Sequence, residues 1–156
     1  SAEIINVILH VAINEKHYNQ FYFYLLQHLT KLDRKYRLAL DFAIRDKITD
    51  LQSLTANNRS RLEEIMCRLL VHNCLCITCL KVIQFSDMNE IYVQFIRNIL
   101  QYIFDQSNDS IIQMVLEKIP RKDNFASAIK LFIACFMDTN TKNRVASSIQ
   151  QLQSLS

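Results

Sequence analysis

The densest group of potential metal ligands in this 156-residue chain lies in one short segment, which holds His72, Cys74, Cys76 and Cys79. Thiolate and imidazole groups bind Zn²⁺, and thiols of lowered pKa perform redox chemistry, so a metal or redox enzyme is one hypothesis. Structural zinc sites usually draw two ligand pairs from separate segments, and no second pair occurs in this sequence. Free cysteine is among the most buried residue types, and the residues between these cysteines are mainly apolar. The pattern therefore favours core packing over metal binding.

Other candidates for catalysis are scattered along the chain. His10, His17 and His28 fall on different helical turns, and no residue stands at a spacing that would pair a nucleophile with a base. His28 is expected on the buried side of its helix. The chain has 0 glycines, which excludes glycine-rich phosphate loops and nucleophile elbows. We predict a protein without enzymatic activity, with no catalytic residue, no metal ligand and no cofactor.

Binding of a partner is a more promising function than catalysis, and the first candidate region for it is the aromatic segment from Glu15 to Leu26. A helix from about Asn19 predicts one buried stripe at spacings of three and four, made of Phe21, Leu25, His28 or Leu29, and Leu32. Phe23 and Tyr24 then fall on the polar side. Three explanations are open for an aromatic residue on that side: it is an ordinary exposed residue, a neighbouring helix covers it, or it belongs to a partner-binding surface.

A basic face on the following helix adjoins these aromatic residues if the two helices form a hairpin. Asp41 lies four residues from Arg37 and from Arg45, a spacing that adds about 0.2 to 0.5 kcal/mol per ion pair. A charged helix face of this kind is commonly exposed to solvent without any binding function. It is nevertheless the face on which we would expect a partner to bind. The predicted partner-binding residues are Phe23, Tyr24, Arg34, Arg37, Asp41 and Arg45. With Lys31, the same arginines offer direct RNA binding as an alternative.

The overall composition is that of a globular domain, with 50% hydrophobic and 21% charged residues. A net charge of +3 permits proximity to RNA without requiring it. Apolar runs are short and interrupted, so we expect no membrane segment. For a protein without enzymatic activity we also expect no small-molecule substrate. We expect residues 1–156 to form a single domain, cut from the C-terminal part of a longer protein.

The near absence of glycine and proline predicts helices joined by Asn, Asp, Ser and Thr. Capping-box spacing predicts helix starts at Ser60 and Asp87, and Asn73 is expected to take the left-handed position that ends a helix. Hydrophobic periodicity predicts helices over about 3–15, 19–32, 33–51, 60–73, 76–83, 87–106, 111–119, 123–137 and from 141 onward, with a loop over 51–58. The predicted fold is all-α, a stack of antiparallel helical hairpins.

Three ordered segments resemble a known family. The first is Glu15-Lys16-His17-Tyr18-Asn19-Gln20-Phe21-Tyr22, which is similar to the entry to the second helix in the MA-3 domains of nucleolar proteins that also carry a middle domain of initiation factor 4G. The second spans Tyr36 to Asp46. The third is Leu80-Lys81-Val82-Ile83-Gln84-Phe85-Ser86-Asp87, followed by Phe95-Ile96-Arg97. Order and spacing agree over roughly 3–103, although Gln20 replaces the family's usual proline.

The resemblance implies a HEAT-like helical repeat of the MA-3 type in a nucleolar ribosome-biogenesis factor. Tyr18, Tyr22 and Leu25 would then be framework residues of the first hairpin. Family members bind a DEAD-box RNA helicase of the initiation-factor-4A type and act in small-subunit rRNA processing, so the expected partners are that helicase and the pre-ribosomal particle, with RNA as a further one. The expected location is the nucleus and nucleolus. A spliceosomal relative shares the tyrosine-rich entry and is the alternative.

Overall fold

The computed structural model describes residues 2–153, and over that range the chain is helical, with no strand. The predicted all-α class is confirmed. The α-helices and two short 3₁₀ helices, η1 and η2, are α1 (Ala2–Asn14), α2 (Gln20–Leu32), α3 (Arg34–Thr49), η1 (Leu51–Ser53), α4 (Ala56–Val71), η2 (Ile77–Val82), α5 (Glu90–Phe104), α6 (Asp109–Leu116), α7 (Asn124–Phe136), α8 (Thr139–Arg144) and α9 (Ala146–Gln153).

Asparagine, aspartate and threonine begin the helices, as the lack of glycine predicted. Their side chains accept hydrogen bonds from the free N–H groups of the first turn. Asp33 has a double role at the sharp α2–α3 connection: its backbone N–H donates to the Leu29 carbonyl, and its side chain accepts from the Lys35 N–H at 2.9 Å. One residue thereby ends one helix and begins the next.

Asn73 ends α4 in the left-handed conformation that the sequence predicted, with φ of 60°. The Cys74 N–H donates to the Leu69 carbonyl at 2.8 Å, and the Asn73 N–H donates to the Leu70 carbonyl at 3.2 Å. This pair of bonds is the Schellman motif, which satisfies carbonyls left free at the end of a helix. Asparagine here replaces the glycine that usually fills this position.

Several predicted boundaries were wrong. Helix α4 begins at Ala56 rather than Ser60, because Thr55 caps it by accepting from the Asn58 N–H. Helix α5 is capped by Asn89 rather than Asp87. The two capping-box spacings were coincidental, since an acceptor five residues upstream of Ser60 and one two residues downstream of Asp87 satisfy the first-turn N–H groups. The predicted loop over 51–58 contains η1, and the predicted final helix is two helices, α8 and α9.

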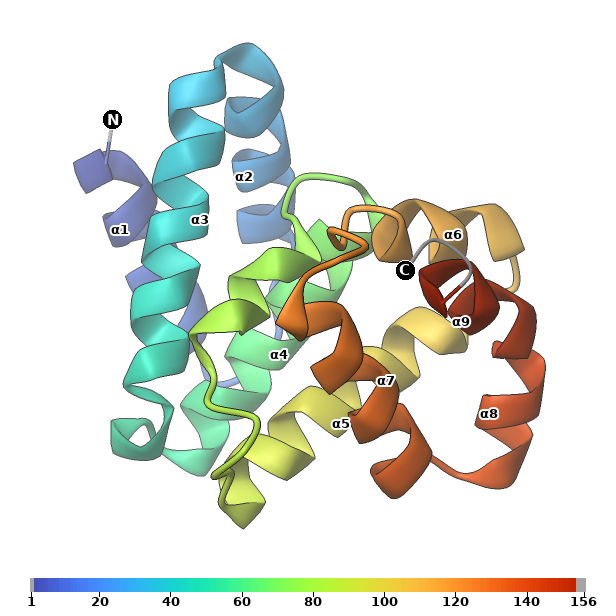
Figure 1. The fold of residues 1–156 in the computed structure, drawn as a ribbon. Helices are drawn as coiled ribbons and strands as arrows, with labels where there is room; N and C mark the ends of the chain where they lie inside the picture. The colour runs from blue at the N-terminus through green and yellow to red at the C-terminus, as the bar shows by residue number, and fades with distance from the viewer. Residues whose placement is uncertain (1, 154–156) are drawn as a thin grey trace.

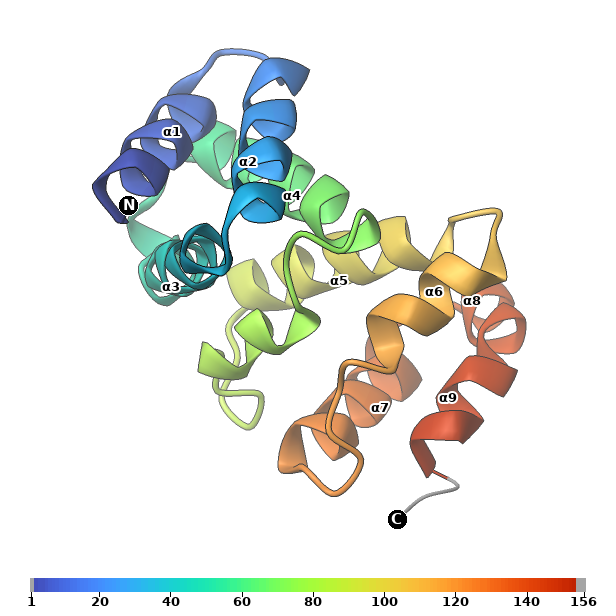
Figure 2. The same cartoon turned by 90° about the horizontal axis from the view of Figure 1, so that it is seen from above.

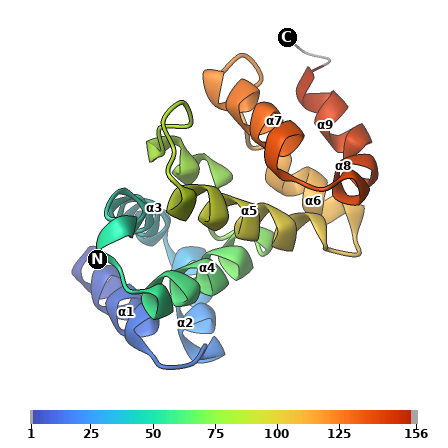
Figure 3. The same ribbon diagram turned by 90° about the horizontal axis from the view of Figure 1, so that it is seen from below.

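The first four helices pack into one group, with α1 against α3 and α4 and with α2 against α3 (Figures 1 and 2). Helix α4 then packs on α5, and α6 to α9 follow on the far side of α5 from α1 (Figure 3). The short η2 lies against α3. A continuous set of buried apolar side chains extends from Ile5 in α1 to Val145 before α9. None of the described helices is long and apolar enough to span a membrane.

The buried side of α2 differs from the prediction. Phe23, Leu26 and Thr30 are buried, whereas Phe21, His28 and Leu32 are exposed. Four consecutive aromatic residues allow two stripes with helical spacing, and periodicity alone does not choose between them. The contacts of α2 with α1, α3 and α4 select the stripe that contains Phe23.

Candidate partner-binding site

One face of α3 carries four of the predicted partner-binding residues, and the structure brings all four to a single hollow. Arg34, Arg37, Asp41 and Arg45 line it together with Leu38. They share one side of the helix because they recur at spacings of three and four. The opposite wall is the segment after α4 and the start of η2, and consists of Cys74, Leu75, Cys76 and Thr78. The hollow has a volume of about 290 Å³, and we call it the arginine hollow.

Arg37 joins the two walls of the arginine hollow. Its Nη1 donates to the Asn73 carbonyl at 2.7 Å, and its Nη2 lies 3.4 Å from Asn73 Oδ1. A guanidinium presents its donors in a rigid fork, so it can hold two acceptors of one residue at once. Arg37 therefore fixes α3 to the end of α4, and much of its hydrogen-bonding capacity is used inside the molecule.

Asp41 pairs with only one of the two arginines that the spacing allowed. Arg45 Nε donates to Asp41 Oδ2 at 2.8 Å, while Arg37 turns to Asn73. Three arginines against one aspartate leave the lining with a net charge of +2. Arg34 is exposed and forms no ion pair within residues 2–153. It is the cation of this hollow that is most available to a ligand.

Apolar surface accompanies these charges. Leu38 is 50% exposed, and Phe42, one turn later on α3, is 68% exposed. Exposed aliphatic and aromatic side chains beside arginine are the combination found in protein interfaces. The face thus offers a positive hollow with an apolar border.

The two aromatic residues predicted for the site lie elsewhere. Phe23 is buried, with 3% of its surface exposed, and its ring centroid lies 5.1 Å from that of His72, which precedes Asn73. The expectation that Phe23 is exposed was wrong, because it belongs to the buried stripe of α2. Tyr24 is 56% exposed as predicted, but it does not line the hollow.

The framework role expected for the first tyrosines agrees with their contacts. Tyr22 Oη donates to Glu15 Oε1 at 2.9 Å and so joins α2 to the link that precedes it. The Arg68 guanidinium lies over the Tyr18 ring, 4.7 Å from its centroid, which ties the same link to α4.

Most of the cysteines are packing residues, whereas Cys76 is only partly buried and lines the arginine hollow. Cys67, Cys74 and Cys79 are buried, and no group of three His, Cys, Asp or Glu side chains among the described residues is arranged to hold a metal. Burial, followed by the charge of Glu63, raises the pKa of Cys67 to about 12, and burial also raises the pKa of Cys79. Their reactive thiolate forms are therefore scarce at neutral pH.

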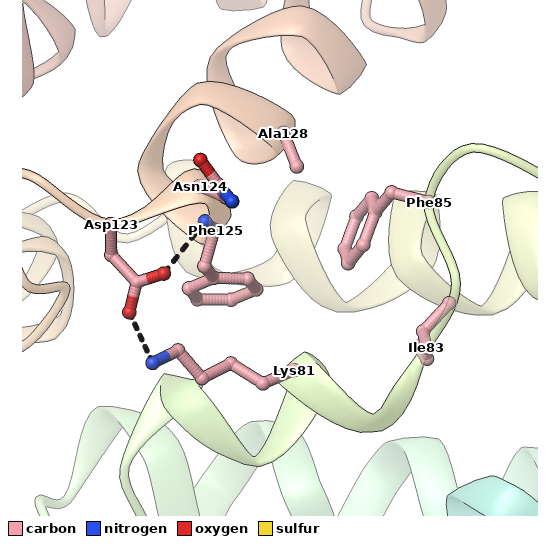
Figure 4. Close-up of a pocket in the computed structure, with 7 residues that line it drawn as sticks. All are labelled: Lys81, Ile83, Phe85, Asp123, Asn124, Phe125 and Ala128. Carbon is pink, nitrogen blue, oxygen red and sulfur yellow. Dashed lines mark hydrogen bonds and ion pairs between the residues drawn. The ribbon is translucent and has the colours of Figure 1, made fainter.

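A second hollow, of about 330 Å³, lies between η2 and α7 (Figure 4). Ile83, Phe85 and Phe125 form its apolar part, and the Phe85 and Phe125 ring centroids are 5.9 Å apart. At its polar end Lys81 pairs with Asp123, and this bond lowers the pKa of Asp123 (Figure 4). Asp123 also accepts from the Phe125 N–H at 3.1 Å and so caps α7. The arrangement is suited to holding α7 against η2.

Sequence reasoning missed the whole second wall of the arginine hollow. The bond between Arg37 and Asn73 joins residues 36 positions apart, and no local pattern reports such a contact. The cysteine-rich segment was noticed only as a possible metal site. The available signal was the predicted left-handed turn at Asn73, which exposes a carbonyl that an arginine can reach.

Comparison with known proteins identifies related chains. Residues 1–76 match the model of the MA3 domain family. The chain is 29% identical over 90% of its length to nucleolar MIF4G domain-containing protein 1 of Homo sapiens, and 27% identical over 90% to the Mus musculus protein of that name. It is 25% identical over 84% of its length to the Drosophila melanogaster homolog. The matched parts are 17%, 17% and 16% of those relatives, so the chain spans about a sixth of their length.

Proposed function

Because this chain is related to the nucleolar MIF4G domain-containing proteins and matches the MA3 family over residues 1–76, we propose that it is a non-catalytic protein-interaction domain of a ribosome-biogenesis factor. The relatives are named as nucleolar proteins, which supports the predicted location in the nucleus and nucleolus. The same names favour the nucleolar reading over the spliceosomal alternative.

The proposed partner is a DEAD-box RNA helicase of the initiation-factor-4A type, which the domain binds and stimulates during small-subunit rRNA processing. The observation that supports a binding role is the α3 face, where the positively charged arginine hollow adjoins exposed Leu38 and Phe42. An acidic segment of the partner with an apolar anchor is complementary to such a face. Arg34 contributes the most accessible charge, and Arg37 contributes mainly by holding the hollow open.

The test is binding of the purified chain to the purified helicase, measured together with the helicase ATPase rate. We expect binding and a higher ATPase rate. Arg34→Glu should weaken binding by about tenfold, which is about 1.4 kcal/mol. Arg121→Glu, at an exposed position outside the hollow, is the matched charge reversal and should leave binding unchanged.

The possible failures are distinct. No binding of the wild-type chain would refute the helicase proposal for this domain. Binding of the wild type and of Arg34→Glu with equal affinity would refute the assignment of the site to the α3 face and leave the helicase proposal standing.

Direct RNA binding is the second candidate function, and the net charge of +2 in the arginine hollow favours it. A single-stranded RNA would bind through its phosphates, so the affinity must fall steeply as salt rises, with a slope set by the number of phosphates contacted. A titration between 50 and 200 mM salt tests this. With a slope of about 0.7 per phosphate for a single strand, six phosphate contacts would lower the affinity by about 300-fold over that range. Affinity that does not change with salt would exclude RNA as the ligand of this face.

A further inference from the structure

A third cavity, which shares no lining residue with the arginine hollow, lies where the α1–α2 link meets α4 and α5. Its volume is about 350 Å³, at the small end of the range for ligand sites. Its lining combines two tyrosines, two glutamates and one arginine with smaller groups, and we call it the tyrosine–glutamate pocket: Tyr18, Glu63, Glu64, Cys67, Arg68, Asn98 and Tyr102.

The polar atoms of this pocket include more acceptors than donors. Both Glu63 oxygens accept from the same group, Asn98 Nδ2, at 3.2 and 3.1 Å. Glu64 Oε1 accepts from Arg61 at 3.2 Å, but its buried Oε2 has no hydrogen-bond partner among the described residues. The buried Tyr18 hydroxyl is also without a partner in that part of the chain. Buried polar groups normally find partners. The Glu64 oxygen calls for a donor, whereas the Tyr18 hydroxyl can donate or accept. Arg61 Nε is also buried without an acceptor among the described residues.

The charge of the lining favours a cation as that donor. Two carboxylates against the single Arg68 leave the lining with a net charge of −1 when both glutamates are ionised. Arg61, which lies outside the lining, already pairs with Glu64 at 3.2 Å, so the carboxylate without a cationic partner in the described part of the chain is Glu63. Arg68 is engaged with the Tyr18 ring and forms no ion pair within residues 2–153. Among the described residues, Glu63 has only a neutral amide as its hydrogen-bond partner. A second cation can therefore enter opposite Arg68 and pair with Glu63.

We propose that the tyrosine–glutamate pocket binds the guanidinium group of an arginine side chain presented by a protein partner. A guanidinium carries five donors in a plane, so it can pair with the Glu63 carboxylate through two bonds. Its flat face and its methylene stem pack on aromatic rings such as that of Tyr102. The pocket is thus a second contact of the interaction domain, with charge opposite to that of the arginine hollow.

The ionisation of Glu63 links this binding to pH. Burial raises the pKa of Glu63 to about 7, with Glu64 adding to the increase, while Asn98 and Arg59 oppose it. The other titratable or charged groups that line the pocket with Glu63 and Glu64 are Cys67 and Arg68 from α4, Tyr102 from α5 and Tyr18 from the α1–α2 link. A bidentate pair requires the ionised carboxylate, and the ionised fraction of a group with a pKa near 7 rises about tenfold between pH 6 and pH 8. Affinity for arginine should rise by a similar factor.

The probe is N-acetyl-L-arginine amide, titrated into the isotope-labelled 156-residue chain and followed by amide chemical shifts. We expect saturable shifts confined to the pocket, with a Kd on the order of millimolar at pH 8 because the ligand is small. N-acetyl-L-citrulline amide, which has nearly the same shape and no charge, should produce no saturable shift. No helicase is present in this experiment, so its failure would not affect the proposed function.

Two variants and a control test the residues. Glu63→Gln should weaken arginine binding at pH 8 by about tenfold or more and remove its pH dependence. Tyr18→Phe removes only a hydroxyl that has no partner within residues 2–153, so it should keep the fold and weaken binding less. Glu117→Gln is the control, since Glu117 is exposed and outside the pocket. The proposal is overturned by an absence of saturable shifts, by equal binding of citrulline, or by unchanged binding to Glu63→Gln.

Discussion

Replacing Arg37 by alanine should destabilise the fold, although Arg37 was expected to contact a partner. Its Nη1 donates to the Asn73 carbonyl at 2.7 Å, whereas the second contact, to Asn73 Oδ1, is long at 3.4 Å. One charge-assisted hydrogen bond from a half-buried side chain to a backbone carbonyl contributes about 1 kcal/mol or slightly more. A cation near the end of α4 adds about 0.5 kcal/mol by interaction with the helix dipole. The expected loss of unfolding free energy is about 1 to 2 kcal/mol.

Urea unfolding monitored by circular dichroism measures this loss. With a slope of about 2 kcal/mol per molar urea, the midpoint should fall by about 0.5 to 1 M. Arg34→Ala is the matched control, because Arg34 lies one turn earlier on the same face, is exposed and forms no ion pair in the described part of the chain. Its effect should stay within about 0.5 kcal/mol.

A double-mutant cycle then locates the bond. Asn73→Gly removes the side-chain acceptor but keeps the backbone carbonyl and tolerates φ of 60°. Arg37→Ala should therefore cost nearly as much in the Asn73→Gly background as in the wild type, with a coupling below about 0.5 kcal/mol. If Arg37→Ala and Arg34→Ala have the same stability, the reasoning is refuted, and Arg37 is free to serve a partner.

Three further outcomes are expected. The pKa of Glu63 is about 7 in the folded chain against an ordinary value of 4.5, so the native state binds more protons than the unfolded state between these pH values. The unfolding free energy of the wild type should therefore fall as the pH rises from about 4.5 to above 7. In urea unfolding at pH 5 and pH 8, Glu63→Gln should remove about 1 to 2 kcal/mol of that loss. A stability difference between variant and wild type that is independent of pH would contradict this. Exposed Cys135 should react with iodoacetamide in the native chain while buried Cys67 does not, as peptide mass spectrometry would show, and equal labelling would refute the burial argument. Phe23→Ala should lower the unfolding free energy by about 3 to 5 kcal/mol, because the Phe23 side chain is buried. A loss below about 1 kcal/mol would show that this side chain is exposed.

The helical class, most helix positions and several helix ends follow from the sequence because they depend on neighbouring residues. Without glycine, the connections rely on side chains that accept hydrogen bonds locally, and such caps act within three residues. Asn73 and Asp123 were placed correctly on that basis. The tyrosine-rich entry and the segment from Leu80 to Asp87 pointed to the family, because the order and spacing of residue types can be compared without knowing which residues are in contact.

Tertiary packing decided which residues face the solvent and which meet across the fold. Four consecutive aromatic residues in α2 leave its buried side undetermined by periodicity, and contacts with three other helices chose Phe23 over Phe21. Arg37 could pair with Asp41 nearby, yet it binds Asn73, because packing brings the end of α4 within reach. The tyrosine–glutamate pocket likewise joins Tyr18, Glu63 and Asn98 from three segments. Contacts between distant positions depend on the relative placement of whole helices, which no local pattern of residues specifies.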